Sequence, residues 1–495
     1  MRAGIADVAE REVREKHPRG LYALFFTEMW ERFSYYGMRA LLVLFMVDAV
    51  KHGGMGLTDE TATAIYGLYT AAVYLAALPG GWVADRFLGA QRSVWYGGIV
   101  IACGHFALAI PRTECFYAGL MLVVLGTGLL KPNVSAMVGE LYPEGGARRD
   151  AGFTVFYMGI NLGAALGPLV CSALGEKVNW HYGFAAAGVG MVLGLVQYRL
   201  WAKQPGEAER GRGGRAELRR RDWLLLMAIL CAGALAVSLL LTGAVHVNPV
   251  VVAHAATYGI VGVAVLYFVC VLLLFRLDGT EKRRVAVILV LFIASALFWS
   301  GFEQAGSSLN LFAERYTERL LLHYTIPAGW FQSLGAIFVI SLAPVVAAVW
   351  LRLARRELNP PLPVKFALGL MLLAAGFLVM AGASKVVAAG HKVWPQWLIT
   401  TYLLHSLGEL CLSPVGLSSV TKLAPRRLVG QMMGTWFLAT SLGNLIAGLT
   451  AGRFSAEGVT QMPGRYLQIV LTAAGTGLLL LVFTKPIRKL MTGVE

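Results

Sequence analysis

The chain has 495 residues, of which 57% are apolar and 14% are charged. Soluble domains carry about 25% charged residues, so this composition excludes an ordinary water-soluble enzyme. If a membrane-spanning helix needs about 20 mostly apolar residues, the apolar fraction is enough for roughly fourteen spans. The formal net charge of +15 can indicate a partner only after its position relative to those spans is known.

Hydropathy predicts fourteen membrane-spanning helices. In chain order they cover 21–49, 64–86, 93–111, 115–139, 151–175, 181–201, 223–245, 250–275, 285–313, 328–351, 364–387, 395–421, 430–452 and 466–486. Four prolines interrupt apolar runs, at positions 79, 132, 168 and 414. Because proline removes a backbone hydrogen bond, we expect some of these helices to bend or break.

Basic side chains divide unevenly between the connecting segments. With a cytoplasmic N-terminus, the cytoplasmic segments hold 31 Lys and Arg residues and the opposite segments hold 9. The positive-inside rule then places both termini in the cytoplasm. The net charge is therefore a signal of membrane orientation, and no nucleic-acid partner is expected.

One charged, glycine-rich stretch, residues 202–222, divides the series of spans and has the composition of a cytoplasmic linker. Six spans precede it, and two uncharged spans and then six more follow. The chain is predicted to be an all-α integral membrane protein with the layout of major-facilitator transporters. The predicted domains are an N-terminal six-helix bundle (1–201), the linker, an inserted transmembrane hairpin (223–278) and a C-terminal six-helix bundle (279–495).

Seven ionisable side chains lie deep inside predicted spans, where a charge is costly unless it faces a cavity or a partner. They are Glu28, Glu31, Arg32, Arg39, Lys131, Glu303 and Glu409. A side chain that snorkels to the interface, or a buried pair that only fixes packing, is the structural alternative. Several of the seven are too far from a span end to snorkel, so we favour a functional role for the set.

The first span concentrates four of these charges. Positions 28, 32, 35, 36 and 39 follow helical spacing, so their side chains share one face of a helix, with Glu31 beside Arg32. Two carboxylates beside one arginine can exchange a proton while one charge stays compensated, as proton coupling requires. A packing cluster that neutralises itself is the alternative.

The other charges have opposite signs in the two halves of the chain. Arg39 and Lys131 belong to the first half, and Glu303 and Glu409 to the second. Prolines follow Lys131 and Glu409 within about a turn, and broken helices beside ions commonly line binding sites at the membrane midplane. A cavity between two such bundles would suit a small zwitterion, with its carboxylate toward Arg39 and Lys131 and its ammonium toward Glu409.

Longer motifs, in order, resemble those of the prokaryotic proton-dependent oligopeptide transporters of the major facilitator superfamily. They are ExxERFxYYG at 28–37, followed by Arg39, FTxFYxxINxG at 153–163, FWxxFEQ at 298–304 and GELCLSPVGLS at 408–418. The resemblance covers most of the chain, and prokaryotic members of this family also carry an inserted hairpin.

The resemblance implies proton coupling by Glu28, Glu31, Arg32 and Glu303. It implies substrate binding by Arg39, Tyr36, Tyr74, Lys131, Tyr157, Asn161, Trp299, Glu303, Glu409, Ser413 and Trp436. The peptide carboxylate would bind Arg39 and Lys131, helped by Tyr36, and the amino terminus would bind Glu409 and Asn161. Glu303 would pair with Arg39 as protonation and substrate binding alter the gates.

Other implied roles concern aromatic residues and one loop. Tyr74, Tyr157, Trp299 and Trp436 would shape side-chain pockets, although Tyr and Trp in membrane helices more often face lipid or pack in a core. The segment 81–92 resembles the cytoplasmic-loop motif of the superfamily. There Asp85 and Arg86 would stabilise the outward-facing state by ion pairing at a switching interface.

Two positions depart from the family pattern. Gly335 stands where members often have an asparagine that helps to hold the amino terminus, and Ala164 follows Gly163 where serine is frequent. Loss of that amide weakens the inference to ordinary di- and tripeptides. The main charged residues are intact, so peptides remain the predicted substrate.

We therefore predict a monomeric, proton-coupled symporter that imports di- and tripeptides by alternating access through a cavity between two bundles. Its partners are the peptide, protons and the lipid bilayer of a bacterial inner membrane, and it needs no cofactor or metal. The alternative is a related transporter of nitrate or a modified amino acid.

An enzyme or a receptor is disfavoured. The sequence has no HExxH and no GxSxG with a partner histidine. His105 and His405 are single residues in apolar runs and are interpreted as packed or pocket-lining residues. Six isolated cysteines without CxxC spacing indicate neither a zinc site nor a disulfide framework.

Overall fold

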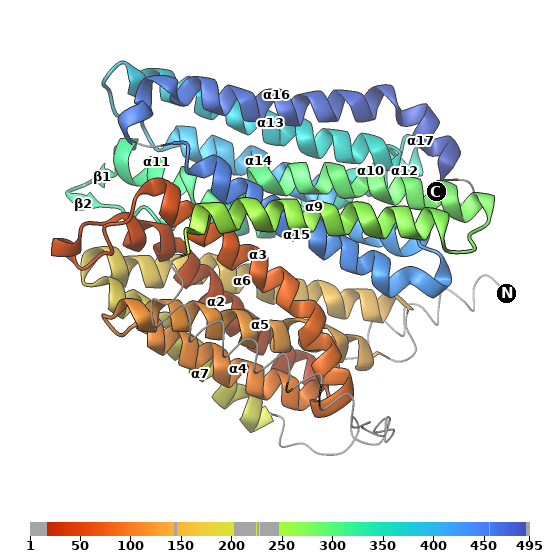
Figure 1. The fold of residues 1–495 in the computed structure, drawn as a ribbon, viewed down its shortest axis with the longest axis horizontal. Coiled ribbons are helices and arrows are strands. Elements are labelled where there is room, and N and C mark those ends of the chain that lie inside the picture. The colour runs from red at the N-terminus through yellow and green to blue at the C-terminus, as the bar shows by residue number, and fades with distance from the viewer. Residues whose placement is uncertain are drawn as a thin grey trace. The chain divides into compact units, whose positions relative to one another are not determined.

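A computed structural model describes residues 17–142, 146–201, 224, 227, 247–454 and 456–491 of the chain. These residues are almost entirely helical (Figure 1). The long helices are α2 (Arg19–Val47), α3 (Asp59–Val83), α4 (Ala90–Leu108), α5 (Thr113–Glu140), α6 (Gly146–Lys177), α7 (Trp180–Trp201), α9 (Pro249–Leu273), α10 (Gly279–Phe302), α12 (Trp330–Arg355), α13 (Leu362–Ala388), α14 (Gln396–Leu423), α15 (Val429–Ala451) and α16 (Met462–Val482). Shorter elements are α11 (Ser308–Tyr316), α17 (Thr484–Leu490), β1 (Leu320–Leu321) and β2 (Tyr324–Thr325).

The long helices lie where hydropathy predicts membrane spans. The predicted span 115–139 is α5, and the predicted span 364–387 is α13. Among the described residues, ten helices are long and apolar enough to cross a membrane. Three further predicted spans correspond to α2, α4 and α14, which have 29, 19 and 28 residues but are not among those ten helices. The span predicted at 223–245 lies almost wholly outside the described residues.

Contacts divide the chain into two compact units. Unit 1 comprises residues 1–38, 76–175 and 179–248, and unit 2 comprises 39–75, 176–178 and 249–495. Helices α2 and α3 are therefore each divided between the units, after residues 38 and 75. The domain boundaries predicted from the count of spans stay a prediction, and the predicted linker lies outside the described residues.

In unit 1, α4 packs against both α5 and α7. Three glycines of α6, spaced one turn apart, lie against the backbone of α2: Gly159, Gly163 and Gly167. A Cβ atom at Gly163 would come within 2.1 Å of the Met29 carbonyl oxygen. Small residues at such crossings let two membrane helices approach closely. This crossing fixes one side of α2, the helix that carries most of the buried charge.

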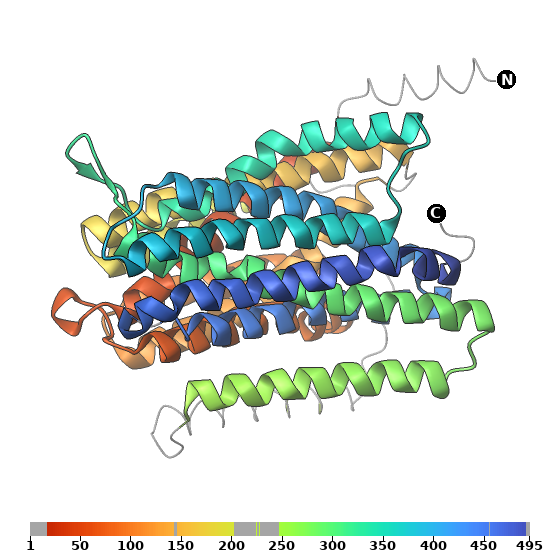
Figure 2. The same cartoon turned by 90° about the horizontal axis from the view of Figure 1, so that it is seen from above.

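In unit 2, α13 packs against α14 and α16, and α15 packs against α10 and α9. Phe377 of α13 stacks on Tyr466 of α16 within the core. The β1–β2 hairpin projects beyond the helix ends of this unit (Figure 2), and its Tyr324 ring contacts Trp330 of α12. Its turn residues Leu322 and His323 both have positive φ, 46° and 68°, as a two-residue hairpin turn requires.

The break expected at Lys131–Pro132 and near Pro414 is not found, and a bend at these prolines stays a prediction. Pro79, Pro132, Pro168 and Pro414 all lie within continuous helices. A proline removes only one hydrogen bond, and a neighbouring helix can satisfy the carbonyl four residues earlier. For Pro132 that carbonyl belongs to Gly128, and its oxygen lies so close to Gly80 of α3 that a Cβ there would be 2.0 Å away.

The clearest break in a predicted span lies elsewhere and contains no proline. The span predicted at 285–313 is α10, a 3-10 turn over Glu303–Gly306, and α11. Ser307 is the breaking residue, with φ −125° and ψ −96°. Side chains bond to groups near the break: the Gln304 amide donates to Ser300 O, and the Tyr402 hydroxyl donates to Ala305 O. The break places Glu303 at the end of a helix inside the protein.

Candidate functional site

Glu28, Glu31 and Arg32 form a buried cluster on α2, here called the α2 cluster. Arg32 Nε lies 3.3 Å from Glu28 Oε1 and donates a hydrogen bond to Glu31 Oε2. All three side chains are at most 5% exposed. The Arg32 guanidinium also lies 5.1 Å from the centre of the Tyr35 ring, in cation–π contact. The predicted proton-coupling residues of this helix are thus brought together.

A charged residue on a second helix of unit 1 interacts with the α2 cluster. With both carboxylates ionised, the cluster carries one net negative charge. Lys131 of α5 interacts electrostatically with Glu28, and Tyr36 interacts with Arg32. Lys131 was predicted as a ligand of the peptide carboxylate, and the structure places it within the field of the α2 cluster. Its ammonium favours the ionised form of Glu28.

Arg39 and Glu303 form a buried ion pair in unit 2. Arg39 Nη2 lies 2.6 Å from Glu303 Oε2, and the side chains are 6% and 4% exposed. Arg39 Nε also donates a hydrogen bond to the Tyr66 hydroxyl, at 2.5 Å. The guanidinium is thus held by a charged and a neutral partner from two helices.

The helix break makes this pair possible. Gly306, the last residue of the 3-10 turn, lies against both partners of the hydrogen bond, since a Cβ there would be 2.1 Å from Tyr66 Oη and 3.0 Å from Arg39 Nε. Just beyond the break, the Asn310 amide donates to the Ala40 carbonyl at 2.8 Å. The chain is therefore tied to α2 on both sides of the break, by Glu303 to Arg39 and by Asn310 to Ala40.

Glu409 of α14 is the second acidic residue predicted in this half of the chain. Its carboxylate lies near enough to Glu303 for the two groups to interact electrostatically. Ser413 follows one turn later and is half-buried. Unit 2 thus brings two carboxylates into each other's field, and one of them pairs with Arg39.

The predicted pocket aromatics differ in burial. Trp299 is 8% exposed, with its ring edge-on to Phe302, and its indole N–H has no hydrogen-bond partner among the described residues. Trp436 is 6% exposed and packs tightly on Gly416. Tyr74 is half-buried, so it remains accessible in part.

Asn161 and Tyr157 lie one turn apart on α6. Tyr157 is 38% exposed, whereas Asn161 is buried. The Asn161 side-chain amide donates to the Tyr157 carbonyl at 3.0 Å. Because an ammonium group only donates hydrogen bonds, an amino terminus would bind the side-chain oxygen of Asn161.

The predicted gating pair lies at the end of α3. Asp85 and Arg86 are exposed within a π-helical turn over Ala84–Leu88. Gly89 ends this turn with φ 77°, a value that glycine adopts without strain. The turn thus presents both charged side chains at the surface.

Sequence reasoning missed two ionic contacts of unit 2. Arg315 of α11 forms a two-fold hydrogen bond with Asp59 of α3, at 2.6 and 2.7 Å. Glu176 accepts hydrogen bonds from the backbone N–H groups of Ala328 and Gly329, at 2.7 and 2.9 Å, just before α12 begins. These residues lie near predicted span ends, where charges are usually solvated, so no sequence pattern indicates their partners.

The two histidines of the apolar runs are buried. His105 is fully buried, and His405 is 2% exposed and packs on Phe377. Within the described part of the chain, no three His, Cys, Asp or Glu side chains gather as metal ligands. The cysteines in that part are free.

Comparison with known proteins gives consistent matches along the chain. The family model described as "POT family" matches residues 91–463. A peptide transporter of Yersinia enterocolitica is 42% identical, covering 97% of this chain and 96% of its own. A di-/tripeptide transporter of Lactococcus lactis is 37% identical, covering 97% of each chain.

Solved structures agree with these relatives. A crystal structure of a peptide transporter POT with sulfate superimposes with a TM-score of 0.89 at 40% identity, covering 96% of each chain. A POT family transporter in complex with 5-aminolevulinic acid gives a TM-score of 0.85 at 32% identity, covering 95% of this chain and 97% of the other. The predicted major-facilitator fold is confirmed by these likenesses.

Proposed function

We propose that this chain, which belongs to the POT family, is a proton-coupled symporter that imports di- and tripeptides by alternating access. The family consists of secondary transporters, so the chain is a transporter and not an enzyme. Two relatives whose names specify peptides or di- and tripeptides match it over nearly their full length. Transport of the same substrate class by this chain is the simplest reading of that likeness.

The buried pair of Arg39 and Glu303 is the observation that carries the proposal. A buried arginine cannot lose its proton at any physiological pH, so its charge must always be compensated. A proton on Glu303 removes the present partner, and a peptide carboxylate can then take its place on Arg39. Proton uptake and substrate binding are thereby linked through one guanidinium.

The α2 cluster supplies a second place for the coupled proton. Glu28 and Glu31 share Arg32, so a proton on one carboxylate leaves the other ionised and the arginine compensated. Lys131 lies in the same field. The cluster can therefore change its charge by one without leaving an unpaired ion in the membrane, which would be costly.

We assign the two ends of the peptide to side chains of opposite charge or matching polarity. We assign the peptide carboxylate to Arg39 and Lys131 with Tyr36, and the amino terminus to Glu409 and Asn161. The side chains of the peptide would contact the aromatic residues and Ser413; the aromatic residues are Tyr74, Tyr157, Trp299 and Trp436.

The proposal includes the membrane that holds the chain and the orientation of the chain in it. The excess of basic residues in alternate loops supports cytoplasmic termini in a bacterial inner membrane. Asp85 and Arg86 then lie on the cytoplasmic side, where their ion pairing would stabilise the outward-facing state. We also propose that the chain acts as a monomer and that protons are its coupling ion.

Uptake of labelled dialanine into proteoliposomes is the direct test. An inward proton gradient should drive accumulation, and Glu31→Gln should abolish it while leaving the protein folded. Glu114→Gln, at the start of α5 and outside both charge clusters, is a matched control that should transport normally. Accumulation that is equal with and without the gradient would refute proton coupling.

One observation favours a second candidate, a non-peptide substrate. Gly335 leaves open space beside α14, since a Cβ there would meet only Ser406 Oγ, at 3.9 Å. A solved relative binds 5-aminolevulinic acid, which is not a peptide. Competition by dipeptides with both termini blocked separates the candidates: loss of affinity on blocking supports peptides, and unchanged affinity supports the alternative.

A further inference from the structure

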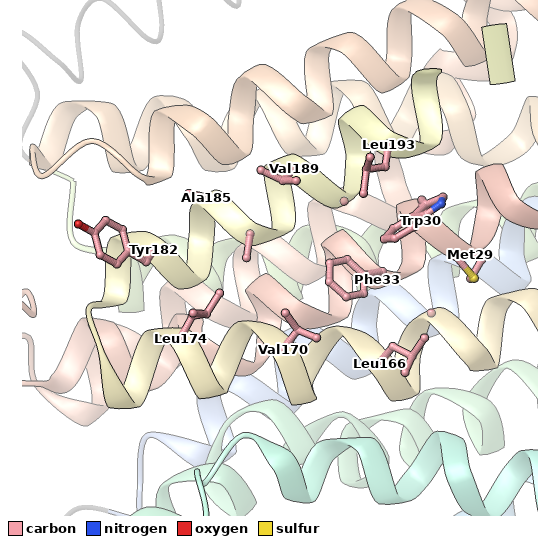
Figure 3. Close-up of a pocket in the computed structure, with 13 residues that line it drawn as sticks. Met29, Trp30, Phe33, Leu166, Val170, Leu174, Tyr182, Ala185, Val189 and Leu193 are labelled. Carbon is pink, nitrogen blue, oxygen red and sulfur yellow. The ribbon is translucent and has the colours of Figure 1, made fainter. Parts of the chain in front are cut away.

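A long groove opens on the surface of unit 1 between α6 and α7, with α2 as its floor (Figure 3). Its volume is about 680 Å³. The walls are formed by Leu166, Val170 and Leu174 of α6 and by Ala185, Val189 and Leu193 of α7. No charged side chain lines it.

The groove is continuous with a surface that faces the bilayer. Val170, Val189 and Leu193 are 43%, 50% and 46% exposed, although they belong to apolar membrane-spanning helices. In a membrane such side chains contact hydrocarbon, so the groove is an indentation in the lipid-facing wall. Water would be a poor occupant, because an apolar groove offers it no hydrogen-bond partner.

The length of the groove matches one leaflet of the bilayer. On α7 it runs from Tyr182, near the start of the helix, to Leu193, and on α6 from Gly163 to Leu174, near the end. Eleven residues of helix rise about 16 Å. Half of the hydrocarbon core of a bilayer is about 15 Å thick. The groove therefore extends from one membrane interface to the midplane.

The two ends of the groove differ. Tyr182 marks the interfacial end and is 60% exposed, which suits an aromatic side chain with a polar tip at the level of the headgroups. Toward the midplane end, Trp30 and Phe33 of α2 form the floor (Figure 3). Their rings lie edge to face, with centroids 5.4 Å apart. A flexible hydrocarbon chain that enters from the interface would end against these rings.

We propose that this groove is a binding site for a single phospholipid acyl chain, which packs against Trp30 and Phe33 and supports α2 at the α2 cluster. Trp30 and Phe33 directly flank Glu31 and Arg32 in the sequence. On its other side this part of α2 already touches the backbone of α6 at Gly163. The bound chain thus lies against α2 directly beside the cluster.

Native mass spectrometry tests occupancy without any transport assay. Protein extracted in a mild detergent should retain one phospholipid per chain that Ala185→Phe with Val189→Phe removes, because two rings one turn apart would fill the groove. Val192→Phe with Val196→Phe is the matched control, since both residues are exposed on α7 outside the groove. Equal lipid retention by the two variants would overturn the proposal, as would a dimer that only the groove variant loses.

Proteoliposomes of defined chain length test the effect on α2, and this readout alone rests on the proposed function. Uptake by the wild type and by the control variant should differ at least threefold between 14-carbon and 18-carbon lipids. Uptake by the groove variant should be the same in both lipids. Lipid retention with no uptake in any lipid would instead refute the proposed function. An identical response of all three proteins would refute support of α2 by the chain.

Discussion

Gly306 lies directly against the Tyr66 hydroxyl, at a distance that leaves no room for a Cβ atom. We predict that Gly306→Ala displaces Tyr66 from Arg39 and lowers peptide uptake about tenfold or more, because overpacking costs ~1–3 kcal/mol. Uptake of labelled dipeptide measures the effect. Gly475→Ala, on α16 with open space around it, should be neutral. Normal uptake by Gly306→Ala would show that the contact with Tyr66 is dispensable.

The Arg39–Glu303 pair should show strong coupling between its partners. We predict that Arg39→Gln lowers the midpoint of thermal unfolding more than the double variant with Glu303→Gln, because the single change leaves a buried carboxylate without its cation. A double-mutant cycle in detergent should give an interaction of roughly 0.5–3 kcal/mol.

A surface pair provides the control for that cycle. Arg427 and Glu281 lie 3.5 Å apart, and the Arg427 side chain is 52% exposed. Exposed pairs contribute about 0–1 kcal/mol, so Arg427→Gln should scarcely move the midpoint. If Arg39→Gln and Arg427→Gln lower the unfolding midpoint equally, the buried pair contributes no more to stability than the exposed pair.

Glu176 caps the segment that leads into α12. We predict that Glu176→Gln lowers the unfolding midpoint by a few degrees, since a charged cap at a helix N-terminus contributes about 0.5–2 kcal/mol. The carboxylate also lies 3.4 Å from Arg319. Glu314→Gln, whose side chain is 43% exposed, is the matched control. Hydrogen exchange at the Ala328 and Gly329 amides should rise only in Glu176→Gln, and unchanged protection there would contradict the capping role.

Gly335→Asn should sharpen the preference for a free amino terminus. The space beside Ser406 can hold an amide side chain, which would add a hydrogen bond on the α14 face that carries Glu409. We expect a dipeptide with a blocked amino terminus to compete at least tenfold more weakly in the variant than in the wild type. Gly335→Ala fills part of the space without an amide and should leave the ratio of affinities unchanged. The same shift in both variants would attribute the effect to volume alone.

The helices were predictable because the bilayer fixes their length and composition. For α5 and α13 the hydropathy pattern agrees with the helix bounds within two residues. The break at Ser307 was not predictable in this way. The segment has no proline, and its small residues resemble those that pack helices together elsewhere in the chain. Only the contacts with Tyr66 and Tyr402 show why the backbone departs from a helix there.

The charged side chains were identifiable because charge inside an apolar span is rare. The partners of these charged side chains were harder to identify from the sequence. The α2 cluster follows from helical spacing, since its members are neighbours on one helix. Tyr66 could not be found, because a tyrosine in an apolar run gives no sign of its partner. Resemblance supplied the pairing of Arg39 with Glu303, which no local pattern contains.

The pairing of Arg32 with Glu28 and Glu31 on one helix has a consequence for biogenesis. Synthesis reaches α2 long before α6, whose glycines will later cover it. A lone arginine near the centre of an inserting helix costs about 2.5–3.5 kcal/mol, and two unpaired glutamates would add to that cost. Because Glu28 and Glu31 both bond to Arg32 within the same helix, α2 brings its own counter-ions into the translocon. Arg32 can therefore enter the membrane together with its counter-ions, whereas Arg39 of the same helix gains Tyr66 and Glu303 only later.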